Sequence, residues 1–60
     1  MTVRFLVSKI VPDFPVRLRG TEGIYEEKLA GEIYDSPDSF YDKTVVLDWT
    51  FYREFLLIDT

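Results

Sequence analysis

The sequence contains no cysteine and no histidine. The absence of cysteine excludes disulfide bonds, thiolate zinc sites and cysteine nucleophiles, and the absence of histidine removes the commonest general base and metal ligand. Long apolar runs are absent as well, since the longest, residues 55–58, is far too short to cross a membrane. We therefore expect an untargeted cytoplasmic protein with no membrane partner, no cofactor, no metal and no enzymatic activity.

What the chain does contain is typical of a folded protein, with 47% hydrophobic and 17% aromatic residues. Its 60 residues show no repeat, low-complexity tract or linker, so residues 1–60 are expected to form a single small β domain. A domain of this size buries only about 60% of its unfolded surface, which makes the core marginal. A homodimer is therefore expected.

Charge is distributed unevenly along the chain, although the net charge is only −4. Residues 1–20 carry four basic residues against Asp13, whereas residues 21–60 carry ten acidic residues against three basic ones. Eight of the acidic residues lie between Glu22 and Asp48, and they predict a region of negative potential that is either functional or only solubilising. Such a surface repels phosphate groups, so nucleic acid is not an expected partner.

Alternating apolar residues predict strands along most of the chain. Residues 3–7 have the period of a half-buried strand, with Leu6 as the exception, and prolines at 12 and 15 predict a bend before a short strand at 16–19. Residues 24–30 are ambiguous and are interpreted as irregular or as a mobile hairpin arm. A strand is expected at 32–34, and a polar loop is expected over residues 35–43.

The clearest strand prediction is at residues 45–51, where the apolar residues share one parity and the polar ones the other. Two interpretations of the C-terminus remain open. Residues 55–58 form a last strand after a turn at 52–54, or Asp48 caps a helix with Trp49, Tyr52 and Leu56 on one side. Trp, Thr, Phe, Tyr and Ile favour the strand.

These elements predict an all-β fold: a five- to six-stranded antiparallel sheet or a small barrel, with room for one short helical turn. The spacing of the segments at 16–18, 30–33, 45–48 and 55–57 resembles that of SH3-like small barrels over about forty residues. That resemblance is topological and implies a binding role rather than catalysis.

Polar and aromatic residues between the strands are the candidates for a functional site. Asp35, Asp38 and Asp42 lie close together, but their spacing differs from that of a calcium loop, so a solvated turn is the expected interpretation. Trp49, Phe51 and Phe55 are expected in the core. Phe40 and Tyr41, at the end of a polar loop, either fold back onto the core or contact a partner.

The leading functional hypothesis is a non-enzymatic adaptor or inhibitor that binds a protein through an acidic face bearing aromatic rings. The alternatives are an acidic decoy that mimics nucleic acid, as in inhibitors from phages or mobile elements, and a homodimer that binds a small ligand. The expected partner-binding residues are Tyr34, Asp38, Phe40, Tyr41, Asp42, Tyr52, Arg53 and Glu54.

Overall fold

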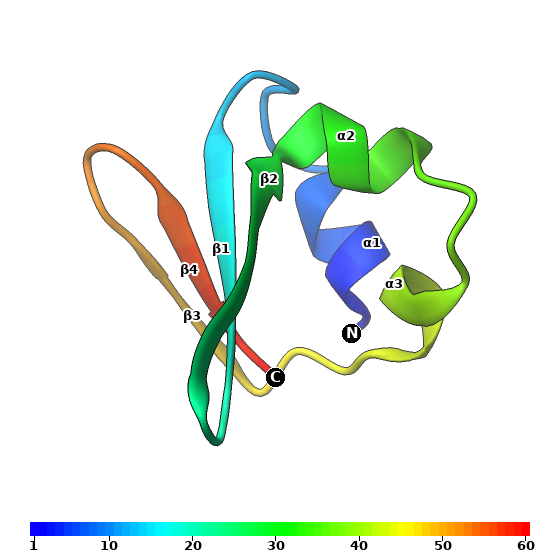
Figure 1. The fold of residues 1–60 in the computed structure, drawn as a ribbon. Helices are drawn as coiled ribbons and strands as arrows, with labels where there is room; N and C mark the ends of the chain where they lie inside the picture. Colours follow the sequence, from blue (N-terminus) through cyan, green and yellow to red (C-terminus); the bar gives the residue numbers. More distant parts are fainter.

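A computed structural model describes all 60 residues as two layers, a four-stranded mixed sheet with three short helices packed on one face (Figure 1). No helix has the length and apolar character needed to cross a membrane. The elements, in chain order, are α1 (Val3–Val7), β1 (Pro15–Gly20), β2 (Gly23–Leu29), α2 (Ala30–Asp35), α3 (Phe40–Lys43), β3 (Asp48–Phe51) and β4 (Leu56–Asp59).

The strand order in the sheet is β2-β1-β4-β3. Two antiparallel hairpins, β1–β2 and β3–β4, are joined by parallel pairing of β1 with β4, with Val16 opposite Leu56 and Leu18 opposite Ile58. β2 and β3 therefore form the two edges. The prediction of an all-β fold with five or six antiparallel strands or an SH3-like barrel was wrong, because the sheet is mixed, open and covered by helices.

The first element is a helix, α1, where the alternating pattern predicted a strand. The Thr2 side chain caps the helix by accepting a hydrogen bond from the Phe5 N–H at 3.2 Å. Val3, Leu6 and Val7 are buried at spacings of three and four residues, the period of a helix face. Leu6, the residue that breaks the strand pattern, is thus the one that completes the helical stripe.

The expected strand at 32–34 lies within the helix α2, and the expected loop over 35–43 ends in the helix α3, so that only residues 36–39 connect the two helices as a loop. The Glu32 carboxylate accepts the Leu29 N–H at 2.9 Å at the start of α2, and Ala30 and Ile33 bury one side of the helix. At Gly31 the backbone lies so close to Pro12 that an added Cβ would come within 2.9 Å of the proline Cβ. Glycine is therefore required for this contact between α2 and the loop after α1.

The strands agree with the sequence in part. The expected strand at 16–19 lies within β1. Of the ambiguous segment at 24–30, residues 24–29 belong to β2, a strand with a shift of register against β1, which begins at Gly23 with φ 115°. β3 begins only at Asp48, since Val45 forms just an isolated bridge with Thr2. The last strand is confirmed as β4, after a turn at 52–54.

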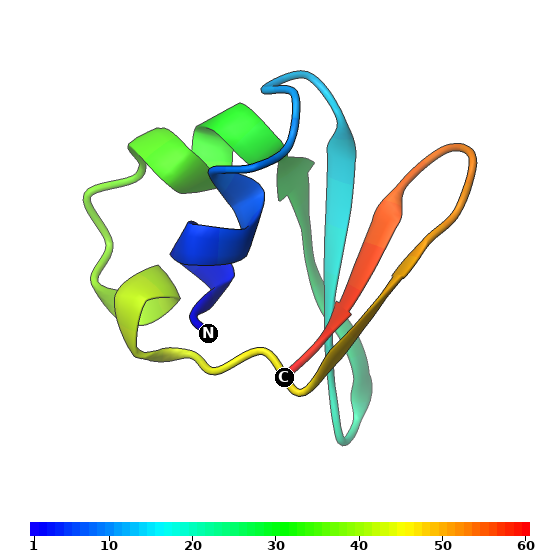
Figure 2. The ribbon, with the colours of Figure 1, turned by 180° about the vertical axis from the view of Figure 1, so that it is seen from behind.

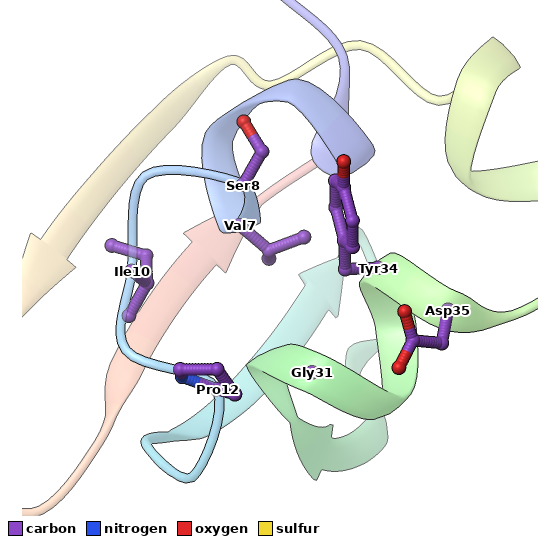
Figure 3. Close-up of a pocket in the computed structure, with 7 residues that line it drawn as sticks. All are labelled: Val7, Ser8, Ile10, Pro12, Gly31, Tyr34 and Asp35. Carbon is purple, nitrogen blue, oxygen red and sulfur yellow. The ribbon is translucent and has the colours of Figure 1, made fainter.

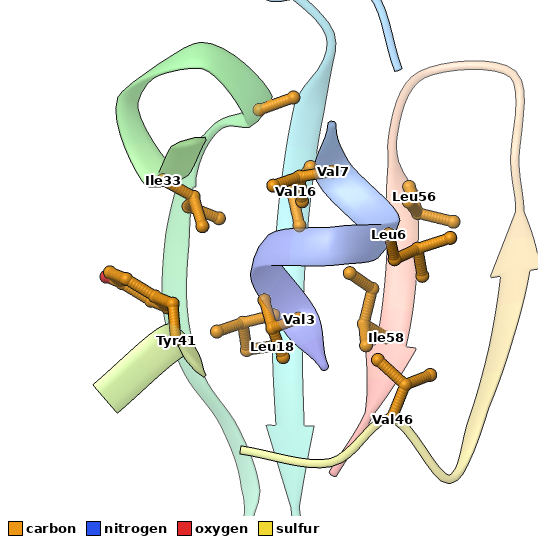
Figure 4. Packing of buried hydrophobic residues seen from close by; sticks show 11 residues of the cluster. Val3, Leu6, Val7, Val16, Leu18, Ile33, Tyr41, Val46, Leu56 and Ile58 are labelled. Carbon is orange, nitrogen blue, oxygen red and sulfur yellow. The ribbon is translucent and has the colours of Figure 1, made fainter. Parts of the chain in front are cut away.

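The core lies between the helices and the two central strands (Figure 4). Leu18, Ile58 and Val3 are fully buried there, and Tyr41 is the only aromatic residue that is buried. The prediction that Trp49, Phe51 and Phe55 form the core was wrong, because the first two are exposed and the third is only partly buried.

Arg4 connects all three helices. Its Nε donates to Asp42 Oδ1 at 2.7 Å, and its Nη1 donates to the carbonyls of Tyr34 at 2.8 Å and Ser36 at 2.7 Å. Nη2 donates to the Asp38 carbonyl at 2.8 Å. These acceptors include carbonyls at the C-terminal end of α2, which have no partner within the helix. The guanidinium of α1 therefore fixes the connection between α2 and α3.

We expect Arg4→Lys to lower the melting temperature by at least about 10 °C, since hydrogen bonds to a charged group contribute about 1.5–3 kcal/mol each and 1 kcal/mol shifts a domain this small by about 4–8 °C. Lysine keeps the charge but lacks the planar array of donors. Thermal unfolding by circular dichroism measures the change. Arg53→Lys, in the exposed β3–β4 turn, is the matched control, and equal melting temperatures for the two variants would contradict the role of Arg4.

Candidate functional site

β3 lies at the edge of the sheet and pairs only with β4. At the end of this hairpin the Tyr52 N–H donates to the Phe55 carbonyl at 2.9 Å. Bonded and non-bonded pairs alternate along an antiparallel ladder. The next residues of β3 that bond to β4 are therefore Thr50 and Asp48, two and four positions back along the strand.

The backbone groups of the two intervening residues, Trp49 and Phe51, point away from β4 toward the open edge. The Trp49 N–H, which has no partner in the ladder, is bound by Asp48 Oδ1 at 2.8 Å. The Trp49 carbonyl and both polar groups of the Phe51 backbone lie along the same edge. β3 thus presents a short row of hydrogen-bonding groups to an incoming strand.

The side chains of Trp49 and Phe51 point to the face of the sheet that carries the helices, as their partners Ile58 and Leu56 do. They nevertheless remain 43% and 55% exposed. The reason is visible in two opposite views, in which the β3–β4 hairpin extends away from the helices (Figures 1 and 2). The helical layer covers the middle of the sheet but not this edge.

One partly buried ring adjoins these aromatic side chains, since the Phe14 ring lies 6.0 Å from the Phe51 ring. Leu47, one residue before β3 in the chain, is 74% exposed. We call the set Phe14, Leu47, Trp49 and Phe51, together with the free backbone groups of β3, the open-edge surface. Exposed apolar residues that adjoin one another on a small protein are typical of interaction sites.

The opposite edge, β2, is protected from pairing. It carries three consecutive charged residues, Glu26, Glu27 and Lys28, and its register with β1 shifts at a bulge. The Leu29 N–H at this edge is bound by the Glu32 side chain. The backbone N–H of Glu27, two residues earlier, also points away from β1 toward this edge. Charges and bulges are the usual protection of edge strands, and β3 has no bulge and one charge, Asp48.

The eight residues predicted to bind a partner do not form one patch. Tyr34, Asp38 and Asp42 surround Arg4 near the ends of α2 and α3, and the Phe40 ring packs beside Tyr41 at 5.5 Å. The other three residues form the β3–β4 turn, on the opposite side of the molecule in both views (Figures 1 and 2). These three are Tyr52, Arg53 and Glu54.

Tyr41 is only 2% exposed, so its ring cannot serve as a surface contact. Its hydroxyl donates to Glu26 Oε1 and accepts from Lys28 Nζ at 3.4 Å. Burial, and then the hydrogen bond to Glu26, raises the pKa of Tyr41. The sequence left core packing and partner contact open for this ring, and the structure shows core packing, since β2 supplies polar partners for the hydroxyl.

Ion pairs neutralise part of the expected acidic face. Four of the seven basic residues pair with carboxylates: Arg4 with Asp42, Arg17 with Glu27, Arg19 with Asp59, and Lys28 with Glu26. The hydrogen bond from Arg19, at 2.6 Å, lowers the pKa of Asp59, and the same contact raises the pKa of Arg19. No group of three or more acidic side chains is placed to bind a metal ion.

A recess of about 280 Å³ lies between the end of α1, the loop that follows it, and α2 (Figure 3). Val7, Ile10 and Pro12 provide its apolar part, and Tyr34 and Asp35 add a hydroxyl and a carboxylate. Its size suits a single side chain or a small ligand rather than a cofactor. Among the residues around it, the sequence predicted Tyr34 to bind a partner and Asp35 to lie in a solvated turn.

Comparison with known protein families, with curated proteins and with solved structures finds no match to this chain.

The surface position of Trp49 has a direct consequence for stability. We expect Trp49→Ala to lower the melting temperature by only a few degrees when the chain is dilute enough to be a monomer, because the side chain is 43% exposed in the single chain. Leu18→Ala, at a fully buried position, should cost about 2–5 kcal/mol and unfold much of the population. Thermal unfolding of both variants tests this, and equally severe losses would place Trp49 in the core.

The raised pKa of Tyr41 predicts a loss of stability in alkali. An unfolded tyrosine releases its proton near pH 10, whereas folded Tyr41 holds it to higher pH, so this stabilisation is complete below about pH 10 and declines above it. We expect Tyr41→Phe to melt below the wild type at pH 7, with a difference that shrinks as the pH rises past 10. If the difference in melting temperature between the wild type and Tyr41→Phe stays constant across this pH range, the raised pKa of Tyr41 is contradicted.

Proposed function

We propose that this protein is a non-enzymatic protein-binding module, and that it binds an extended segment of a partner protein as an additional strand along β3. The observation that supports this most strongly is the contrast between the two edges of the sheet. β2 combines its exposed apolar side chains, Ile24, Tyr25 and Leu29, with three consecutive charged residues and a bulge, whereas β3 has exposed aromatic rings with one charged residue and no shift of register. Strand addition to an exposed edge is a common mode of peptide recognition.

The backbone and the side chains have separate roles in this mode of binding. The Trp49 carbonyl and both polar groups of the Phe51 backbone supply hydrogen bonds to the incoming strand, and the Trp49 N–H joins them when it leaves Asp48 Oδ1. The Trp49 and Phe51 rings, with Phe14 beside them, select the segment by the side chains that it places on the helix-covered face. Burial of such rings at the centre of an interface commonly contributes 2 kcal/mol or more.

The charges near this edge indicate what the segment carries. Asp48 is the one charged residue of β3, Glu54 lies in the turn that follows, and Asp13 precedes Phe14 in the adjoining loop, against Arg53 alone. A partner strand with apolar residues at alternate positions and a basic residue at one end fits this arrangement. The acids would then mainly accelerate association, as exposed charges do.

The acidic decoy is a weaker proposal. A mimic of nucleic acid needs an extended array of carboxylates available to a basic groove, and four of the eleven acidic residues here are paired with basic side chains. At β3 the exposed side chains are mainly aromatic and apolar rather than acidic.

Selection from a library of displayed random peptides on the immobilised protein tests the proposal. We expect the enriched peptides to be extended, with alternating apolar residues and a basic residue, and Trp49→Ala to weaken their binding at least about tenfold, or ~1.4 kcal/mol. Isothermal titration with one synthetic peptide measures the change.

Chemical synthesis of the 60-residue chain permits a sharper test. An N-methyl group on the Phe51 amide removes an outward donor and obstructs an incoming strand, without altering any side chain. We expect it to abolish peptide binding, whereas N-methylation of Glu27, on the protected edge, leaves binding unchanged. Equal binding by the two methylated proteins would overturn strand addition at β3.

A further inference from the structure

The open edge of β3 is complementary to itself. Its outward backbone groups belong to Trp49 and Phe51, which lie on either side of Thr50. If a second copy of β3 is placed antiparallel about a two-fold axis at Thr50, Trp49 of each chain lies opposite Phe51 of the other. Each of these pairs can exchange two hydrogen bonds, as bonded pairs do in an antiparallel ladder, once the Trp49 N–H replaces its contact with the exposed Asp48 side chain by one with the Phe51 carbonyl of the second copy.

We infer that β3 pairs with β3 of a second copy in this register when no partner strand is bound, joining two four-stranded sheets into one continuous sheet. The inference rests on the proposed strand addition, because the same edge serves both purposes. Partner and second copy then exclude each other, so the homodimer is the form in which the open edge is protected.

Neighbouring registers are less favourable. A shift by one residue sets outward groups of one strand against inward groups of the other. A shift by two in one direction pairs Phe51 with Leu47, whose N–H already donates to the Asp59 carbonyl at 2.8 Å. A shift by two in the other direction pairs Trp49 with Arg53, which lies beyond the end of the strand. Only the register centred on Thr50 uses both free residues in both chains.

The side chains agree with the Thr50 register on both faces of the sheet. On the helix-covered face, the Trp49 ring adjoins the Phe51 ring of the second copy, an aromatic pair of the kind that stabilises neighbouring strands. On the other face, Asp48 lies opposite Tyr52 of the second copy, with Arg53 one residue further along. No two like charges lie opposite each other.

The small core gives a reason for this pairing. Only 12 of the 60 residues are buried, and among the ten aromatic residues only Tyr41 is. A domain of this size gains a large fraction of its stability from any additional apolar burial. Pairing at β3 covers Trp49 and Phe51, which the helices leave exposed.

A single cysteine tests the register directly, because the natural chain has none. Across the proposed axis the two Thr50 residues form a non-bonded pair with Cα atoms about 4.5 Å apart, within the range that a disulfide spans. We expect Thr50→Cys to form a disulfide-linked dimer under mild oxidation at least about tenfold faster than Thr21→Cys, an exposed control in the β1–β2 turn. Asp48→Cys, on β3 but away from the axis, should resemble the control.

Similar rates for Thr50→Cys and Thr21→Cys would overturn the inference, as would faster linkage of Asp48→Cys. Sedimentation equilibrium provides a second readout: the unmodified chain should form dimers, and the chain with N-methyl Phe51 should be a monomer at the same concentration. A monomeric wild type that still binds selected peptides would overturn self-pairing and leave the proposed function standing. Rapid linkage of Thr50→Cys together with a wild-type dimer that no selected peptide dissociates would support self-pairing and count against a separate partner.

Discussion

The guanidinium of Arg4 holds together three helices of five, six and four residues, none of which is long enough to be stable alone. It projects from α1 and donates to Asp42 of α3 and to carbonyls at and beyond the end of α2, while its side chain is only 21% exposed. Because one planar group satisfies acceptors on both neighbours, the three helices behave as one layer. The buried side of that layer, formed by Val3, Ile33 and Tyr41, then packs on the sheet.

The extent of this helical layer determines where apolar side chains of the sheet remain exposed. The buried helical residues lie over β1 and β4, and the Tyr41 hydroxyl reaches Glu26 and Lys28 of β2. Nothing comparable reaches β3, so its inward rings stay exposed although they point toward the side of the core. The same packing that stabilises one half of the sheet leaves the other half available for another chain.

The two edges therefore differ in both chemistry and geometry. Glu26, Glu27 and Lys28 keep β2 from pairing, while β3 offers Trp49, Thr50 and Phe51 with free backbone groups. An unprotected edge on so small a domain would ordinarily invite aggregation. The proposed strand addition, with the inferred pairing between copies as its protected form, assigns a function to that edge and limits its exposure.

The sequence by itself determined the strand at residues 16–19, three of the four residues of β4, the turn at 52–54 and the aromatic strand of which residues 48–51 became β3. These are local features, because alternation and turn residues act within a few positions. The helices depended on distant contacts: Thr2 capping and Leu6 burial outweigh an alternating pattern, and α2 and α3 need Arg4, from more than 25 residues away. The candidate site depended most on such distant contacts. The exposure of Trp49 depends on which strands the helices cover and on the parallel pairing of β1 with β4. No local sequence pattern encodes either of these two features.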